Sequence, residues 1–143
     1  MKRVGLFFAL LFCLPSFADV AANKKLVRDF YELAFNRHQP TEAAKKYIGP
    51  PYIQHNPRVP NGPEAFYGYF EGYFKKNPGA RVEIKRVIGE GDLVVLHLNS
   101  KQNPSDRGRA VVDIFRVANG KIVEHWDVAQ DVPESAANSN TLF

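Results

Sequence analysis

The order of two hydrophobic periodicities along the chain is the strongest constraint on its fold. Between residues 23 and 78, most apolar residues recur every three or four positions, which is typical of amphipathic helices. Beyond that point they alternate with polar residues, as in half-buried strands. Helices followed by consecutive antiparallel strands predict an α+β fold in which the helices cover one face of the sheet.

Three segments are predicted to be helical, namely residues 23–36, 41–48 and 63–76. Asn23 can cap the first, and Gly49 with the two prolines after it ends the second. Pro63 suits the first turn of the third helix, and Asn77-Pro78-Gly79 ends it.

Extended structure is predicted for residues 52–57 and for strands from residue 82, over 94–99, over 109–117 and over 121–129. The connections between them carry turn residues, among them Gly89-Glu90-Gly91-Asp92 and Asn103-Pro104-Ser105-Asp106. No internal repeat or second domain is evident, so residues 19–143 are predicted to form one domain.

The first 18 residues have the pattern of a secretory signal peptide. Lys2 and Arg3 precede an apolar run from Val4 to Leu14, and Ser16-Phe17-Ala18 follows. The run is too short for a stable membrane span. We expect cleavage after Ala18 and a periplasmic or secreted product.

Removal of this leader changes the composition in two useful ways. The only cysteine, Cys13, is lost, which excludes disulfide scaffolds, thiolate metal sites and thiol nucleophiles. Without Lys2 and Arg3, 17 of the 19 basic residues remain against 15 acidic ones, so the domain is near neutral. No basic run is interleaved with aromatic residues, which argues against nucleic-acid binding.

The turn around Asn119-Gly120 decides which side chains of the last two strands share a face. It fits either a two-residue type I′ turn or a three-residue loop with a G1 bulge. We favour the longer loop, because it pairs Asp113 with His125 and gathers three ionisable groups on one apolar face, whereas the two-residue turn would scatter them. That face carries Val111, Asp113, Phe115, Val123, His125 and Asp127. The opposite face carries Ile114, Arg116, Ile122, Glu124 and Trp126.

Two further histidines, His55 and His97, lie in extended or apolar segments. A lone histidine there is more often a hydrogen-bonded structural residue than a catalyst. The pairing of Asp113 with His125 fits two interpretations equally well, a structural contact that holds the sheet or part of a functional site. The clustering of these groups favours a functional role.

Two motifs joined by an aromatic helix carry a family resemblance: Tyr-Ile-Gln-His-Asn-Pro and Asp-Ile-Phe-Arg-Val-Ala-Asn-Gly-Lys-Ile-Val-Glu-His-Trp-Asp-Val. Over nearly all of residues 19–143 the chain resembles SnoaL-like proteins of the NTF2-like superfamily. The resemblance implies a cone-shaped, cystatin-like α+β barrel with N-terminal helices on a curved antiparallel sheet around a pocket. Such proteins include polyketide cyclases, ketosteroid isomerases, dehydratases, epoxide hydrolases and members without activity, so the fold does not select a reaction.

The resemblance also implies a pocket carboxylate that acts as acid and base on a carbonyl substrate, without metal or organic cofactor. Asp127 is the best match and Asp113 the second. We therefore expect a cofactor-free cyclase, isomerase or aldol-type enzyme, with Asp127 as base and His125 orienting it. His55 or His97 would polarise the carbonyl, since a dry pocket strengthens both effects.

The substrate is expected to be a small hydrophobic or carbonyl-containing molecule. Its predicted binding residues are Phe115, Val111, Val95, Tyr52, Phe70 and Phe74. The outward residues Ile114, Ile122 and Trp126 predict a homodimer, unless the chain's own tail covers Trp126.

Two other functions fit the same residues. The chain could be a periplasmic binding or interaction protein that uses the pocket without turnover. The histidines and aspartates could instead hold zinc or iron, but no His-x-x-x-His pair fixes two ligands on a helix, so no metal is expected.

Overall fold

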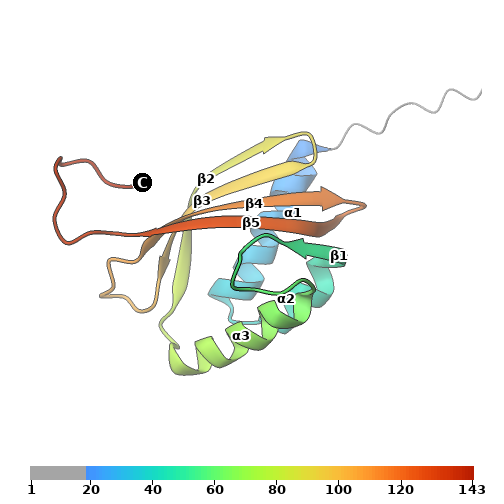
Figure 1. The fold of residues 1–143 in the computed structure, drawn as a ribbon, viewed down its shortest axis with the longest axis horizontal. Coiled ribbons are helices and arrows are strands. Elements are labelled where there is room, and N and C mark those ends of the chain that lie inside the picture. Colours follow the sequence, from blue (N-terminus) through green and yellow to red (C-terminus); the bar gives the residue numbers. More distant parts are fainter. Residues whose placement is uncertain (1–18) are drawn as a thin grey trace, which may run out of the picture.

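Three helices cover one side of a five-stranded sheet in the computed structural model, which describes residues 19–143 (Figure 1). The helices are α1 (Val20–Tyr31), α2 (Pro40–Tyr47) and α3 (Pro63–Lys76), and a π-helical turn, η1 (Glu32–Asn36), continues α1. The strands are β1 (Ile48–Gln54), β2 (Arg81–Glu90), β3 (Leu93–Lys101), β4 (Arg109–Ala118) and β5 (Lys121–Asp131). The predicted α+β fold is confirmed. The proposed signal peptide lies outside the described residues.

The sheet has the order β1-β5-β4-β3-β2, and its last four strands form an antiparallel meander. β1 joins the edge parallel to β5, so the sheet is mixed. Parallel neighbours need a long connection, and here α3 and three strands supply it. The sequence indicated only an extended segment at this position.

The first helix begins earlier than expected. The Asp19 side chain accepts a hydrogen bond from the Ala22 backbone N–H at 3.0 Å, which makes Asp19 the N-cap. Asn23, the expected cap, lies within α1. α3 begins at Pro63, as predicted.

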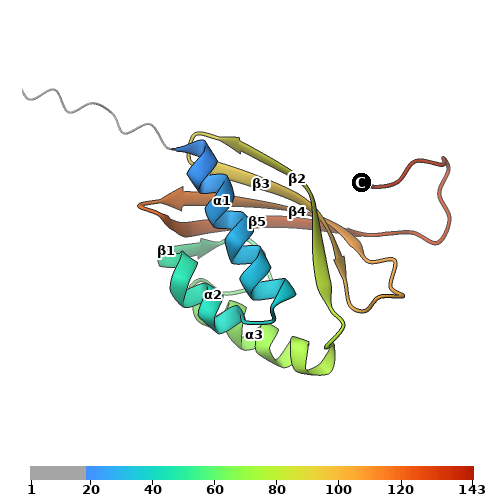
Figure 2. The ribbon, with the colours of Figure 1, turned by 180° about the vertical axis from the view of Figure 1, so that it is seen from behind.

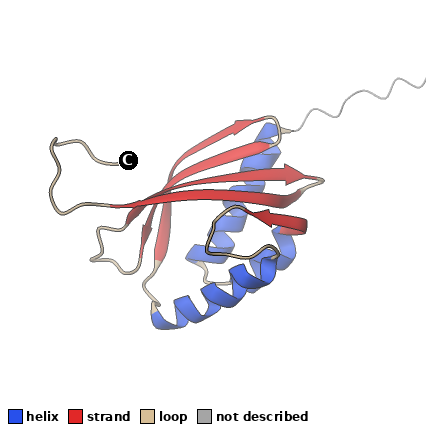
Figure 3. Cartoon of the chain, in the orientation of Figure 1, coloured by secondary structure: helices blue, strands red, loops and turns tan. Residues whose placement is uncertain are grey.

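The core lies between α1 and the sheet (Figure 2). Val27, Phe30 and Tyr31 of α1 are buried against the face of the sheet that carries Leu96 and Phe115. α3 packs mainly against α2 instead of against the strands (Figure 3). Its aromatic face and the sheet line a common pocket. Within the described residues, no helix combines the length and apolar character that a membrane span requires.

The β4–β5 hairpin corrects the predicted register. Ala118 pairs with Lys121 across a two-residue turn in which Asn119 and Gly120 have φ values of 52° and 69°, as in a type I′ turn. A bulge then shifts the pairing, because Val117 faces Ile122 and Arg116 faces Glu124. The extra residue is Val123.

The bulge explains why the ionisable groups still share a face. One additional residue reverses the alternation of β5 beyond position 123. Asp113 therefore lies opposite Asp127, and Phe115 opposite His125. Two assignments were wrong as a result: Ile122 is a fully buried core residue, whereas Val123 does not line the pocket.

Candidate active site

A pocket of about 650 Å³ opens between α3 and the inward face of the sheet. Aromatic side chains form most of its apolar wall: Phe30, Phe35, Phe66, Phe70, Phe74 and Phe115. A polar cluster from β4, β5 and the end of β1 lies against this wall. Most ligand pockets combine such an apolar lining with a few placed polar groups.

The centre of the polar cluster is a buried pair, Asp113 and His125. Nε2 of His125 lies 2.8 Å from Oδ1 of Asp113. The Tyr31 hydroxyl donates to Oδ2 of Asp113 at 2.5 Å. Both oxygens of this nearly inaccessible carboxyl group are thus engaged by side chains that also line the pocket.

Gln54 fixes the hydrogen positions on His125. Its side-chain oxygen accepts the Asn56 backbone N–H at 2.9 Å and also lies 2.9 Å from Nδ1 of His125. Because a backbone N–H can only donate, the group facing Nδ1 is an oxygen, and Nδ1 must carry a hydrogen. Nε2 then shares one further proton with Asp113.

Asp127 is the second carboxylate of the pocket, and it has a different environment. Both of its oxygens accept from Nδ2 of Asn56, at 2.8 and 2.9 Å. It is only partly buried and lines the pocket. The amide orients the carboxylate and leaves lone pairs available to a ligand.

Two phenols complete the cluster. Burial, followed by the negative charge of Asp113, raises the pKa of Tyr31 well above its usual value. Burial likewise raises the pKa of Tyr52 well above its usual value, with contributions from Asp113 and Asp127. Both hydroxyl groups therefore remain protonated and can donate hydrogen bonds.

The position of Tyr52 is also fixed by its backbone. Its φ of 35° lies in the left-handed region, which is uncommon for an aromatic residue. The Gly62 N–H donates to the Tyr52 carbonyl oxygen at 3.1 Å and helps to hold this conformation. Such strain is often found at functional sites.

The residue types of the cluster are those of a metal site, but the ring nitrogens that would bind an ion are already hydrogen bonded. Ligand atoms of Asp113, His125 and Asp127 lie within 4.8 Å of one another. Both ring nitrogens of His125 are already hydrogen bonded, so an ion would have to displace Gln54 or Asp113. The arrangement suits proton transfer better than metal binding.

Most of the predicted site residues line this pocket, but three do not. The ones that do are Asp113, His125, Asp127, Phe115, Val111, Tyr52, Phe70 and Phe74. Val95 and His97 alternate with the buried Val94, Leu96 and Leu98, and thus belong to the outer face of β3.

His55 is the third misplaced residue. It lies on the outer side of the sheet, where its ring stacks on Trp126 and Nε2 lies 2.8 Å from Glu124. Its neighbours Gln54 and Asn56 reach the pocket instead. The prediction selected the titratable residue of this motif and therefore selected the wrong face.

Tyr31, Gln54 and Asn56 were not predicted as site residues. Tyr31 occurs at the spacing of a core residue, and its contact with Asp113 joins positions 82 residues apart. The amides have no distinctive spacing. Only the alternation within Tyr-Ile-Gln-His-Asn-Pro could have indicated that Gln54 and Asn56 share a side.

Comparison with known proteins identifies the family. Residues 27–125 match the family described as SnoaL-like domain, so the chain belongs to that family. It has an NTF2-like fold, and the family includes cyclases and isomerases. No curated protein sequence gives a significant match.

Solved structures agree with this fold. TsrD from Streptomyces laurentii superposes with a TM-score of 0.65 at 21% identity, over 78% of this chain and 90% of that chain. A candidate ketosteroid isomerase from Kribbella flavida gives 0.64 at 15% identity, covering 88% and 90% of the two chains. A candidate polyketide cyclase from Acidithiobacillus ferrooxidans gives 0.61 at 14% identity, covering 78% and 90%. These identities support the fold and do not assign an activity.

Proposed function

We propose that the protein is a cofactor-free enzyme that moves a proton next to the carbonyl group of a hydrophobic substrate, in a cyclisation, isomerisation or aldol-type reaction. One observation carries the proposal: the Asp127 carboxylate is held by Asn56 in an aromatic pocket, beside a hydrogen-bonded histidine–aspartate pair. A positioned carboxylate in such surroundings is suited to general base catalysis.

Asp127 is the better base of the two aspartates. Both oxygens of Asp113 are occupied, one by Tyr31 and one by His125. Asp127 accepts hydrogen bonds only from Asn56 among the described residues and lines the open side of the cluster. Asp113 would hold His125 in place and balance its charge.

Tyr52 takes the role that the sequence suggested for His55 or His97. Of the two phenols in the polar cluster, Tyr31 and Tyr52, it is the one without a hydrogen bond to Asp113, and its raised pKa keeps it a donor. A phenol at this position would stabilise the oxygen on which negative charge develops.

The proton balance is simple. Asp127 removes a proton from the carbon next to the carbonyl, and the electrons of that C–H bond move towards the carbonyl oxygen, where Tyr52 donates a hydrogen bond. Protonated Asp127 then returns the proton to carbon or oxygen of the product. No oxidant or other group is consumed.

Isotope exchange tests this proposal without knowledge of the natural substrate. Propiophenone incubated with the protein in D₂O should lose the proton NMR signal of the CH₂ group next to its carbonyl faster than it does in D₂O buffer without protein. Asp127→Asn keeps the shape but not the basic oxygen, and should slow this exchange by about a hundred- to ten-thousand-fold. Asp113→Asn should retain more exchange activity per folded molecule than Asp127→Asn does.

Equal exchange by the wild type and Asp127→Asn would contradict the proposal. If Asp127 were only a structural partner, its substitution should cost about 1–3 kcal/mol of stability while activity per folded molecule is unchanged. A small molecule carried unchanged through purification, together with no exchange, would support the non-catalytic binding protein.

Export and dimer formation are two further parts of this proposal. Export is inferred from the signal pattern of residues 1–18, and N-terminal sequencing should find Asp19 first.

A homodimer is supported by exposed Val128 and the neighbouring Ile114 and Trp126 on the outer face. His55 and Arg116 cover part of Trp126, whereas the tail residue Phe143 stacks on His97. Light scattering at micromolar concentration should show a dimer.

A further inference from the structure

Basic side chains surround one end of the pocket, at the ends of three strands. Arg81 begins β2, Lys101 ends β3 and Arg109 begins β4, and all three line the pocket. Arg58, from the loop after β1, also lines it. We call these four residues the cationic rim.

The rim concentrates positive charge at a cost to the fold. Arg81 and Lys101 are direct partners in the β2–β3 register. Like charges directly opposite each other on neighbouring strands are destabilising. Across residues 19–143, neither side chain forms an ion pair, and the same holds for Arg58.

Nearby acidic groups compensate this charge only in part. Asp106 lines the pocket, but its oxygens accept the backbone N–H groups of Gln102 and Gly108 and stabilise the β3–β4 loop. Those hydrogen bonds lower the pKa of Asp106. Arg109 pairs with Asp131 at 2.8 Å in an exposed contact, which contributes little. The rim thus retains unpaired donors for an anion.

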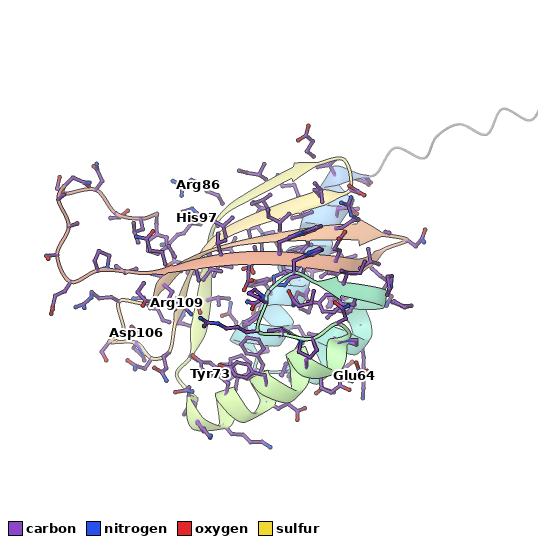
Figure 4. All side chains as sticks on the ribbon, viewed as in Figure 1. Glu64, Tyr73, Arg86, His97, Asp106 and Arg109 are labelled. Atoms are coloured by element: carbon purple, nitrogen blue, oxygen red, sulfur yellow. The ribbon has the colours of Figure 1, made fainter. Side chains whose placement is uncertain are left out.

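Arg109 and the acid–base cluster lie at different positions along the inner face of the sheet, whereas Arg81 and Lys101 line the pocket from the ends of β2 and β3. Arg109 and Asp113 are four residues apart on β4, so their Cα atoms are separated by about 13 Å. Figure 4 shows Arg109, Asp106 and Tyr73 at the same end of the pocket layer, whereas Arg86 and His97 lie together on the other side of the sheet. Aromatic side chains line the same pocket as both polar regions.

We propose that the substrate is a hydrophobic ketone whose far end carries a carboxylate, which the cationic rim binds while the carbon next to the ketone reaches Asp127. This substrate class rests on the proposed function. An anion near Asp113 and Asp127 would be repelled, so the charge must lie at the rim. The pocket would thereby orient the substrate from both ends.

A matched pair of probes tests the rim by binding alone. The probes are 6-naphthoylhexanoate, which has an aryl ketone and a terminal carboxylate, and its neutral primary amide. By isothermal titration calorimetry, the wild type should bind the carboxylate at least tenfold more tightly than the amide. Added salt should weaken binding of the carboxylate and leave that of the amide unchanged.

Variants locate the source of the preference. In Arg81→Gln/Lys101→Met, the preference should fall below threefold while the amide binds as before. Arg86→Gln/Lys45→Met removes the same charge away from the pocket and should keep the preference. Melting temperatures show that each variant is folded.

The outcomes separate this proposal from the proposed function. Equal affinity for the two probes in the wild type, or a preference that survives the rim substitutions, would overturn the anion site. Deuterium exchange on the neutral amide, lost in Asp127→Asn, would still support proton transfer in that case. A rim-dependent preference without any exchange would support the ligand class and count against catalysis.

Discussion

The two faces of the sheet carry the same pair of groups in different surroundings. On the inner face, Nε2 of His125 lies 2.8 Å from Asp113, and on the outer face Nε2 of His55 lies 2.8 Å from Glu124. The inner side chains are 12% and 5% exposed, the outer ones 40% and 16%. The His–carboxylate distance alone therefore does not distinguish the pair in the proposed active site from the pair on the outer face.

What differs is the compensating charge. Arg116 donates to Glu124 at 2.7 Å and to Asp92 at 2.7 Å, so the outer pair belongs to an exposed ionic network. Hydrogen bonds from Arg116 and then from His55 lower the pKa of Glu124. The inner pair has neutral partners instead, Tyr31 and Gln54. The outer carboxylate is thus held in its charged form by an arginine, whereas the inner pair has neutral hydrogen-bond partners beside the pocket.

Replacing each histidine by glutamine should give the largest contrast between the faces. His125→Gln should slow deuterium exchange by about a hundredfold, because small displacements of catalytic groups have effects of that size. His55→Gln should leave exchange within twofold. The rates are measured by NMR at pH 7 and corrected for the folded fraction.

A matching loss of exchange in both variants would show that the two pairs act on the pocket together. Retention of full exchange in His125→Gln would mean that Asp127 needs no support from the inner pair. Either result would break the assignment of chemistry to one face.

Removing one inner hydroxyl should have the next largest effect, this time on stability. Tyr31→Phe deletes the hydrogen bond to the buried Asp113 carboxyl group, and hydrogen bonds to charged groups contribute about 1.5–3 kcal/mol. Urea unfolding should show a loss in this range. The outer control, His55→Gln, should lose less than about 1 kcal/mol, as exposed ion pairs do.

Tyr31 should also make the free energy of unfolding depend on pH in the alkaline range. Its pKa is raised in the folded protein, so its stabilising contribution is present below the ordinary tyrosine pKa of about 10 and is lost as pH rises above it. The free energy of unfolding of the wild type should therefore fall more steeply above pH 10 than that of Tyr31→Phe. Parallel curves would contradict the burial of this phenol.

Much of the fold was predictable because it follows from local pattern. Helical and strand periodicities gave the helices and the antiparallel meander, and alternation gave the inward positions of Asp113 and Phe115. The parallel position of β1 depends on pairing between residues 48 and 122, which no local pattern encodes.

The site was less predictable because it depends on one irregular residue and on distant partners. The Val123 bulge decides the orientation of His125 and Asp127, and a bulge has a weak sequence signal. Titratable residues attracted attention at positions 55 and 97, whereas the amides of Gln54 and Asn56 orient the pocket groups. Chemical reactivity and orientation towards the pocket are separate properties.

The smallest expected effect is that of Glu124, the outer carboxylate, on the free energy of unfolding at acidic pH. Because the pKa of Glu124 is lowered on folding, its contribution is present above the ordinary glutamate pKa of about 4.3 and is lost as pH falls through the folded value. Glu124→Gln removes this contribution. Its free energy of unfolding should lie slightly below that of the wild type at pH 6, and the two should converge as the pH falls below 4. Asp131→Asn is the matched control, because it breaks the exposed pair with Arg109 on the same strand. It should change the free energy of unfolding at acidic pH less than Glu124→Gln does, because the Asp131 side chain is 84% exposed. A deficit of Glu124→Gln that persists undiminished at low pH would mean that shape, and not charge, holds the outer pair together. The contrast between an ionic outer pair and an inner pair with neutral hydrogen-bond partners would then no longer stand.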